Sequence, residues 1–318
     1  MASSAYPDSV NQSPDTVLIC PGQGAQRAGG VADLADDVAD LPAAAQRAFG
    51  LASSVTGCDL WKLGQSADPM DELALRQPSL LQPYLIAWAV AEYSKASERI
   101  GPLTFVTGHS SGMNSAMALS GALDLDSTLQ FAWKCGLSMD RDCNDQPGGL
   151  LALVGAGRDA AEAIAAASGA SLANHNAPDQ TVLGGPADAL ERAAEVAPEY
   201  GGQAVQLRVA GAFHTSAFAG SDRVNRALID ALPITNQFTP IVGNHSGQVI
   251  STAEQLREEL RAQYVRPVEW QAALKTLYAN GVRRYLTLGP GNVMAGLVRR
   301  YGKTLRERIQ IQRISQIN

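Results

Sequence analysis

Cysteine is scarce in this chain of 318 residues, and its few cysteines form no recognisable pattern. No C-x-x-C pair occurs, and no cysteine stands at metal-ligand spacing from a histidine. The four cysteines are Cys20, Cys58, Cys135 and Cys143. We therefore expect a reduced, cytoplasmic protein with no metal site.

An excess of basic residues is also lacking. The chain has 25 Lys and Arg against 31 Asp and Glu, which gives a formal net charge of −6. A field of this sign does not attract nucleic acid or an anionic membrane. We therefore expect no nucleic-acid and no membrane partner, and an acidic protein partner would need a local basic patch.

Long hydrophobic runs, internal repeats and a targeting segment are absent as well. The most apolar stretch, residues 80–90, is interrupted by Gln82 and Pro83 and is too short to cross a bilayer. Residues 1–15 are polar and lack the basic and apolar regions of a signal peptide. We expect residues 1–15 to form a disordered tail.

The rest of the composition is ordinary for a globular enzyme, with 46% hydrophobic and 18% charged residues. Residues 16–20 are β-branched and apolar and end at a Pro-Gly pair, which predicts a buried strand entering a glycine-rich turn. A second strand is predicted at 103–107, followed by a tight turn and a helix to about residue 122. Strands and helices continue to alternate toward the C-terminus, which indicates an α/β fold class.

The pattern of predicted strands and helices changes near residue 146 and changes again near residue 210. Strands are predicted at 150–154, 171–173, 181–184 and 204–209, and helices at 159–168 and 187–196. This alternation is similar to the split βαβ unit. We expect 146–210 to be a small α+β subdomain inserted into a large catalytic domain made of 16–145 and 211–318.

Residues 108–112, Gly-His-Ser-Ser-Gly, match the G-x-S-x-G nucleophile elbow between a strand and a helix. The glycines are needed because the serine sits in a strained turn that leaves no room for flanking side chains. The turn places the serine hydroxyl at a helix N-terminus, where free N–H groups favour developing negative charge. Ser110 is therefore the candidate nucleophile.

A serine nucleophile needs a base, and the chain has only four histidines. His109 lies inside the elbow and is expected to pack or form a hydrogen bond beneath the turn. His175 and His245 stand among polar residues and are expected at the surface. His214 follows a predicted strand in a short loop that can present it to Ser110, and it is the best candidate base.

The first glycine-rich turn, residues 21–26, differs from both the P-loop and the G-x-G-x-x-G dinucleotide motif. A nucleotide site there is disfavoured. An acyl-transfer site needs a second backbone N–H for the oxyanion beside the one at the elbow, and a bare turn can supply it.

Several motifs occur together along the chain: Gly22-Gln23-Gly24-Ala25-Gln26, Gly108-His109-Ser110-Ser111-Gly112, the mid-chain His214 and Gly289-Pro290-Gly291, with further matches at 77–80, 174–180 and 266–270. From about Val17 to Tyr301, the chain resembles the malonyl-CoA:acyl carrier protein transacylases and the acyltransferase domains of polyketide synthases. The resemblance implies a large α/β-hydrolase-like domain with a small ferredoxin-like insertion.

The resemblance also implies roles for individual catalytic residues. Ser110 is the nucleophile and His214 is the base. The backbone amides of Gln23 and Ser111 bind the oxyanion. The histidine is oriented by a backbone carbonyl, at the position of Gln263, and not by an aspartate.

Other positions match the substrate site of the family. Asn174, Asn176 and Gln77 correspond to residues near the acyl group and the phosphopantetheine channel. Phe213, which precedes the base, is assigned to the same site. The phosphopantetheine arm arrives with the substrate, so no cofactor is expected.

Two positions depart from the malonyl-using members of the family. These carry an arginine that pairs with the malonyl carboxylate, and Cys135 stands in its place. Lys134 is adjacent but points about 100° away on a helix. An acidic residue that commonly follows the elbow is replaced by Met113. The acyl group is therefore expected to be uncharged at its far end, unless another arginine, such as Arg141, supplies the charge.

A basic run near the C-terminus is the candidate surface for an acyl carrier protein, which is itself acidic. Arg299, Arg300 and Lys303 are its central members; Arg306, Arg308 and Arg313 continue it, with Glu307 as the single acid. The Arg283-Arg284 pair can extend it. The alternative interpretation is a solvated helix face.

The resulting hypothesis is a monomeric acyltransferase of polyketide or fatty acid biosynthesis. It moves an acyl group other than malonyl from a carrier-protein or CoA thioester to an acyl carrier protein, through an ester on Ser110. Three alternatives stay open. These are hydrolysis of acyl carrier proteins, malonyl transfer with a relocated arginine, and a non-catalytic docking module.

Overall fold

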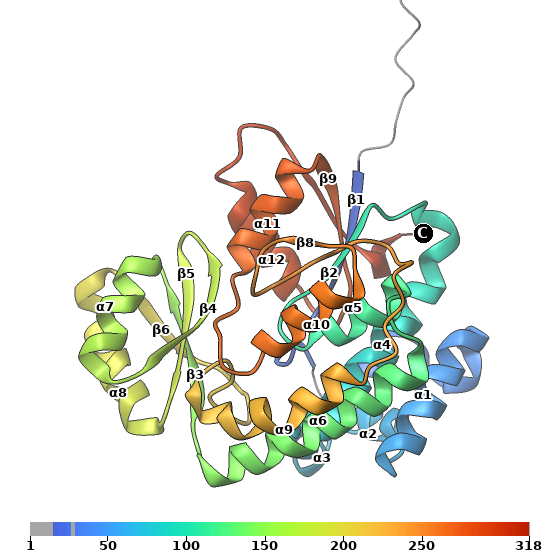
Figure 1. The fold of residues 1–318 in the computed structure, drawn as a ribbon, viewed down its shortest axis with the longest axis horizontal. Helices are drawn as coiled ribbons and strands as arrows, with labels where there is room; N and C mark the ends of the chain where they lie inside the picture. The colour runs from blue at the N-terminus through green and yellow to red at the C-terminus, as the bar shows by residue number, and fades with distance from the viewer. Residues whose placement is uncertain (1–14, 27–28, 318) are drawn as a thin grey trace, which may run out of the picture.

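The computed structural model describes residues 15–26 and 29–317 (Figure 1). It contains a six-stranded sheet and a separate four-stranded sheet, with helices packed on both. The predicted α/β fold class with a smaller α+β sheet is confirmed. Of the predicted tail, Asp15 begins the first strand, and 1–14 lie outside the described residues.

The large sheet has the strand order β10-β9-β1-β2-β7-β8, in which only β8 runs antiparallel to its neighbour. Its strands are β1 (Asp15–Cys20), β2 (Phe105–Gly108), β7 (Ile241–Val242), β8 (Val249–Ile250), β9 (Val282–Thr287) and β10 (Gln310–Arg313). Because β1 and β2 are parallel neighbours, the turns that follow them meet at one edge of the sheet. The two glycine-rich motifs of the sequence are these turns.

Alternate residues of β1 face two different hydrophobic cores, which is why the strand reads as a continuous apolar run. Val17 and Ile19 pack with the helices α11 (Trp270–Ala279) and α12 (Val293–Gly302). Leu18 and Cys20 pack with α4 (Pro78–Ile100), α5 (Gly112–Ser120) and α6 (Leu125–Asp145). All four side chains are fully buried. Helices therefore cover both faces of the sheet, and Figure 1 shows this arrangement.

The helices of the large part are α1 (Ala43–Thr56), α2 (Leu60–Gln65), α3 (Pro69–Ala74), α4 (Pro78–Ile100), α5 (Gly112–Ser120), α6 (Leu125–Asp145), α9 (Ala219–Asp230), α10 (Ala253–Ala262), α11 (Trp270–Ala279) and α12 (Val293–Gly302). Helices α4 and α6 cross so closely that a Cβ at Gly136 would collide with the backbone of Ser79. No helix in 15–26 or 29–317 is long and apolar enough to span a membrane.

The small sheet is antiparallel, with the order β4-β5-β3-β6. Its elements are β3 (Gly149–Val154), α7 (Arg158–Ser168), β4 (Ser171–Ala177), β5 (Gln180–Gly185), α8 (Ala187–Val196) and β6 (Gln203–Gln206). This β-α-β-β-α-β sequence with that strand order is the ferredoxin-like arrangement. The prediction was wrong at two ends: β4 continues to Ala177, and β6 stops at Gln206.

The small sheet is fastened to the large part through β4. The N–H of His175 donates to the carbonyl of Val268 at 2.7 Å, and the N–H of Val268 donates to the carbonyl of Ala173 at 2.9 Å. Arg158 forms an ion pair with Glu269 at 2.8 Å. Residues 174–177 of β4 pair with β5 of the same sheet, and the bridge between Asn174 and Val268 joins this end of the strand to the large part.

The C-terminal segment was predicted only in part. Helix α12 follows the Gly-Pro-Gly turn as expected, but it ends at Gly302, so the basic residues beyond Lys303 are not on it. Residues 310–313 instead form β10 at the edge of the large sheet. Strands β8 and β10 were missed because runs of two and four residues are too short to carry a periodic signal.

Candidate active site

Ser110 lies in the sharp turn between β2 and α5, and its backbone is strained. It has φ +53°, and of the non-glycine residues in 15–26 and 29–317 only His214, at +63°, shares this left-handed region. A Cβ at Gly108 would collide with the backbone of Gly112, and one at Gly112 with the carbonyl of Cys20. The turn therefore closes only with glycine on both sides, as expected for a nucleophile elbow.

The Ser110 hydroxyl lies 2.7 Å from Nε2 of His214, and Nδ1 of His214 lies 2.8 Å from the carbonyl oxygen of Gln263. A carbonyl accepts but does not donate, so Nδ1 carries the proton and donates to Gln263. Nε2 then presents its lone pair, and the serine hydroxyl donates to it. The serine hydroxyl, the histidine base and the carbonyl that orients the histidine are thus joined by two consecutive hydrogen bonds.

The loop that carries His214 is held by its own neighbours. The Thr215 hydroxyl donates to the carbonyl of Ala212 at 2.6 Å and accepts from the N–H of Ala217 at 3.3 Å. The rings of Phe213 and Phe218 pack with centroids 4.8 Å apart. Both contacts fix the histidine in its left-handed conformation, facing Ser110.

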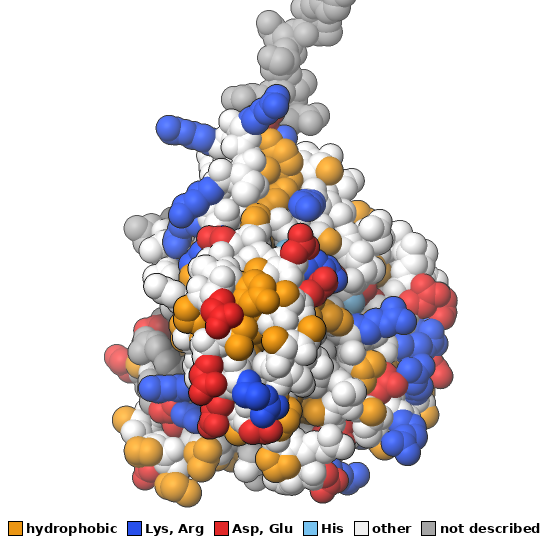
Figure 2. Space-filling view, turned by 90° about the vertical axis from the view of Figure 1, so that its left-hand side faces the viewer, with side chains coloured by type: hydrophobic (Ala, Val, Ile, Leu, Met, Phe, Trp, Pro, Cys, Tyr) orange, Lys and Arg blue, Asp and Glu red, His pale blue; other side chains and the backbone are white. Residues whose placement is uncertain are grey.

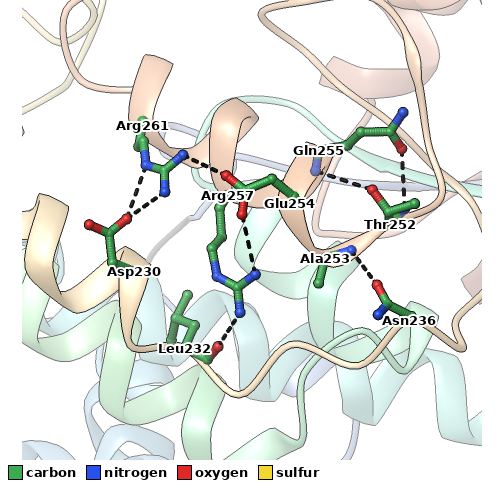
Figure 3. Close-up of polar contacts among 9 residues, drawn as sticks. All are labelled: Asp230, Leu232, Asn236, Thr252, Ala253, Glu254, Gln255, Arg257 and Arg261. Atoms are coloured by element: carbon green, nitrogen blue, oxygen red, sulfur yellow. Dashed lines mark hydrogen bonds and ion pairs between the residues drawn. The ribbon is translucent and has the colours of Figure 1, made fainter.

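Gln263 reaches the histidine because it is the C-terminal cap of α10. This helix begins with a capping box, in which Thr252 and Gln255 each accept a hydrogen bond from the other's backbone (Figure 3). Near its other end, Arg261 pairs with Asp230 of α9 at 2.6 Å and with Glu254 at 3.0 Å. These contacts set the position of the carbonyl that orients His214.

Burial keeps His214 neutral. Loss of hydration is the main cause that lowers its pKa to about 3, and the neighbouring His245 contributes, whereas the bond to Gln263 acts in the opposite direction. The imidazole is therefore a free base across the physiological range. It is able to accept the serine proton without first losing one of its own.

The expectation that His245 lies at the surface is met only in part, because its side chain is half-buried. Its ring centroid lies 5.5 Å from that of His214, and its Nδ1 lies 2.9 Å from the carbonyl oxygen of Pro267. Glu259 of α10 accepts from the N–H of His245 at 2.6 Å and from that of Ser246 at 3.1 Å. These two hydrogen bonds to Glu259 hold the polar loop against α10.

The same loop supports the elbow through Asn244, a residue that sequence reasoning missed. Its Oδ1 accepts from the N–H of Ser110 at 3.2 Å, and the asparagine is almost fully buried. The only signal in the sequence was the turn-forming Gly-Asn-His-Ser-Gly stretch, which does not say where the loop packs.

The two predicted oxyanion donors lie side by side. A Cβ at Gly22 would collide with the carbonyl of His109, so the glycine allows the first turn to touch the elbow. The N–H of Gln23 donates to the hydroxyl of Ser111 at 3.1 Å. One of the two predicted backbone donors is thus occupied by the hydroxyl of Ser111.

A small cavity of about 20 Å³ adjoins Ser110. Its lining residues are mostly apolar or uncharged polar: Gln23, Gln82, Ser110, Ser111, Met139, Phe213, His214, Phe218, Gln263 and Tyr264. None of these described residues is a lysine or arginine. The volume corresponds to one or two small groups, so this cavity has the size and position of an acyl pocket.

Of the six residues predicted to contact substrate, Phe213 lines this cavity and the other five do not. Cys135 and Met113 are almost fully buried in the core, and Gln77 is the exposed N-terminal cap of α4. One turn further into α4, Gln82 lines the cavity instead, with Oε1 accepting from Asn114 at 2.8 Å. Arg141, the candidate relocated arginine, is exposed on α6 and is not among the lining residues.

A larger cavity of about 400 Å³ leads to Ser110 between the two sheets, and both predicted asparagines line it. Asn176 accepts from Nε2 of His109 at 2.8 Å. The His109 ring also packs edge-on against Trp270, and burial lowers its pKa to about 4. His109 therefore packs and forms a hydrogen bond as expected, and it also lines the wall of this channel.

The basic residues that were predicted to form one surface lie in different surroundings. Arg300 lines the channel and pairs with Asp179 of the β4–β5 turn at 2.7 Å, whereas Arg299 and Lys303 are exposed at the end of α12. Arg283 pairs with Glu307, and Arg284 donates to the carbonyl of Ile100. On the face shown in Figure 2, basic and acidic side chains are interspersed.

Comparison with known proteins identifies the family and the fold. Residues 17–312 match the acyl transferase domain family. The malonyl CoA-acyl carrier protein transacylase of Bacillus subtilis is 30% identical over 295 residues, which cover 91% of each chain. The malonyl-CoA:acyl carrier protein transacylase of Xanthomonas oryzae pv. oryzae has a similar structure, with a TM-score of 0.84, 28% identity and 95% of each chain covered.

A second solved structure is a malonyl-transacylase in complex with its type II PKS acyl-carrier protein. It matches with a TM-score of 0.82 and 27% identity, over 94% of each chain. The likeness therefore extends over both sheets and not only over the elbow. On these matches, the chain belongs to the acyl transferase domain family, and it is an acyltransferase.

Proposed function

We propose that this protein transfers a short, uncharged acyl group to an acyl carrier protein through an ester on Ser110. The observation that carries the proposal is the contact of 2.7 Å between the Ser110 hydroxyl and Nε2 of His214, with Nδ1 held by Gln263. A neutral, buried base in contact with a strained serine is the arrangement that covalent acyl transfer needs.

In the first half-reaction, the Ser110 hydroxyl oxygen attacks the thioester carbonyl while His214 Nε2 takes its proton. The amides of Gln23 and Ser111 stabilise the oxyanion, after the Ser111 hydroxyl has left the Gln23 N–H. The carbon–sulfur bond then breaks, and the imidazolium returns the proton to the leaving thiolate. The ester remains on Ser110.

In the second half-reaction, His214 takes the proton of an incoming thiol, whose sulfur attacks the ester carbonyl. The ester bond breaks, and the proton passes to the Ser110 oxygen. The enzyme returns to its starting state, so the kinetics are ping-pong.

We propose an acyl carrier protein as the partner because a related transacylase was solved with one and because the channel suits an extended arm. The channel of about 400 Å³ leads from the surface beside Arg300 to Ser110, and Asn174 and Asn176 supply polar groups along it. A phosphopantetheine arm would extend through this channel. Arg299 and Lys303 at the end of α12 would meet the acidic carrier surface.

The acyl group is proposed to be uncharged because the pocket offers no counter-charge among its described lining residues. A carboxylate desolvated there without a partner would cost several kcal/mol. Cys135 in place of the family's arginine is buried, and burial raises its pKa to about 12, so it is a neutral thiol.

All four cysteines are free thiols, which supports a reducing, cytoplasmic location.

The second candidate function is hydrolysis of the same ester, because a cavity of about 20 Å³ beside Ser110 admits a water molecule. The test is to supply an acyl-pantetheine thioester with and without a carrier protein bearing a free phosphopantetheine thiol. If the enzyme is a transferase, the acylated carrier protein should exceed the free acid. Little of the thioester should then be consumed when the carrier protein is left out. Free acid at the same rate in both reactions would instead identify a hydrolase.

A further inference from the structure

Tyr264 lines the acyl cavity together with Ser110 and His214, and it takes no part in the proposed proton transfers between them. It follows Gln263 directly, so the cap of α10 that orients the base also delivers this ring to the pocket. The residue is 4% exposed. Its place in the wall is thus set by the same backbone that positions the catalytic histidine.

The hydroxyl of Tyr264 has no hydrogen-bond partner of ordinary geometry. Its polar neighbours are the Cys135 thiol and the carboxamides of Gln263 and Asn225, and burial is the main cause that raises its pKa well above the usual value. It therefore stays protonated and remains a donor. A buried hydroxyl without an acceptor has lost its hydration, and a ligand with a suitable oxygen restores the missing hydrogen bond.

A second donor in the same wall is also unused. Nε2 of Gln23 is buried without a partner, whereas both polar atoms of Gln82 are engaged, with Asn114 and with the sulfur of Met139. Two residues that line the cavity therefore carry unused, buried neutral donors, and none of its described lining residues is Lys or Arg. This pattern fits a neutral acceptor oxygen better than a methyl group or a carboxylate.

The size of the cavity limits where that oxygen can be. About 20 Å³ holds one or two small groups beyond the ester carbonyl. Building on the proposed Ser110 ester, we infer that the acyl group is a short one with an oxygen on its second carbon, and that Tyr264 selects it by donating to that oxygen. Tyr264 is then the specificity-determining residue of the pocket.

The experiment compares two pantetheine thioesters of equal size, glycolyl and propionyl, which differ only by a hydroxyl in place of a methyl group. Loading of Ser110 is followed by intact-protein mass spectrometry with both thioesters in competition. The wild type should load glycolyl at least about tenfold faster. In Tyr264→Phe this ratio should fall to within about threefold, because glycolyl loading slows.

Tyr285→Phe is the matched control, because Tyr285 also has a buried hydroxyl without a partner but does not line the cavity. It should keep the wild-type ratio. A wild type that shows no preference or prefers propionyl overturns the inference without any variant, as does Tyr264→Phe with an unchanged ratio. If neither thioester loads Ser110, the proposed function fails as well, so the two failures are distinguishable.

Discussion

The hydroxyl of Ser111 accepts a hydrogen bond from the backbone N–H of Gln23 at 3.1 Å, and this bond joins the two turns that border the nucleophile. The same N–H is a proposed oxyanion donor. In the structure this N–H is occupied by a neighbouring side chain. The proposed mechanism requires this contact to open before the oxyanion forms.

Replacement of Ser111 with alanine removes the hydroxyl and keeps the backbone amide of that residue. Because a typical hydrogen bond contributes about 0.5–1.5 kcal/mol net, the rate of Ser110 loading should be unchanged or raised by at most about tenfold. Single-turnover mass spectrometry measures this rate. A fall of a hundredfold or more would show that the hydroxyl itself takes part in the reaction.

The pH profile of acylation should have no acid limb near 6.5, the ordinary pKa of histidine. Burial lowers the pKa of His214 to about 3, so the base stays neutral, and the loading rate should vary less than about threefold between pH 8 and 5. A small thioester is the suitable substrate, since it needs no carrier docking. Loss of half the rate at pH 6 to 7 would mean that the histidine is hydrated and not buried in the active enzyme.

Charge should decide between acyl groups of the same shape. Malonyl and acetoacetyl have the same number of heavy atoms, but only malonyl ends in a carboxylate. Without a cation in the described lining of the pocket, wild-type protein should load acetoacetyl at least about tenfold faster than malonyl. Competition between the two pantetheine thioesters measures the ratio, and preferential malonylation would refute the specificity proposal.

An arginine at position 135 should reverse part of this preference only if space is made for it. Cys135 is 2% exposed and lies beside Tyr264, so Cys135→Arg alone would overpack the site. The double change Cys135→Arg with Tyr264→Ala should raise malonyl loading relative to acetoacetyl. Tyr264→Ala alone is its control.

The exposed end of α12 should affect carrier proteins but not small substrates. Reversal of Arg299 and Lys303 to glutamate should slow transfer to an acyl carrier protein by about threefold to tenfold, and less at high salt, because exposed pairs contribute about 0.2–1 kcal/mol each. Arg306→Glu with Arg308→Glu makes the same charge change beyond the helix and is the control. An equal effect on a pantetheine thioester would exclude a docking role.

Local patterns were enough to predict the elbow. The strand, the glycines and the helix around Ser110 are neighbours in sequence, and the small number of histidines left His214 as the best base. Gln263 came only from the family resemblance, since nothing local marks a carbonyl that works through a cap.

Residues that reach the site through tertiary packing were missed. His245 looks like a surface residue in the sequence, but Glu259 holds its loop against α10, and Tyr264 enters the pocket only because α10 ends beside His214. Gln77 and Gln82 are five residues apart on one segment, yet only Gln82 lines the cavity. Which of these residues reaches the site depends on how the helices pack against one another. The periodicity of a single sequence does not reveal that packing.

The central claim is that the acyl group is carried as an ester on Ser110, with His214 as its base. Intact-protein mass spectrometry after exposure to an acyl-pantetheine thioester tests it most directly. The wild type should gain the mass of one acyl group, Ser110→Ala should gain none, and His214→Ala should gain it about 10²–10⁴-fold more slowly. An acyl adduct that persists in Ser110→Ala would contradict the account.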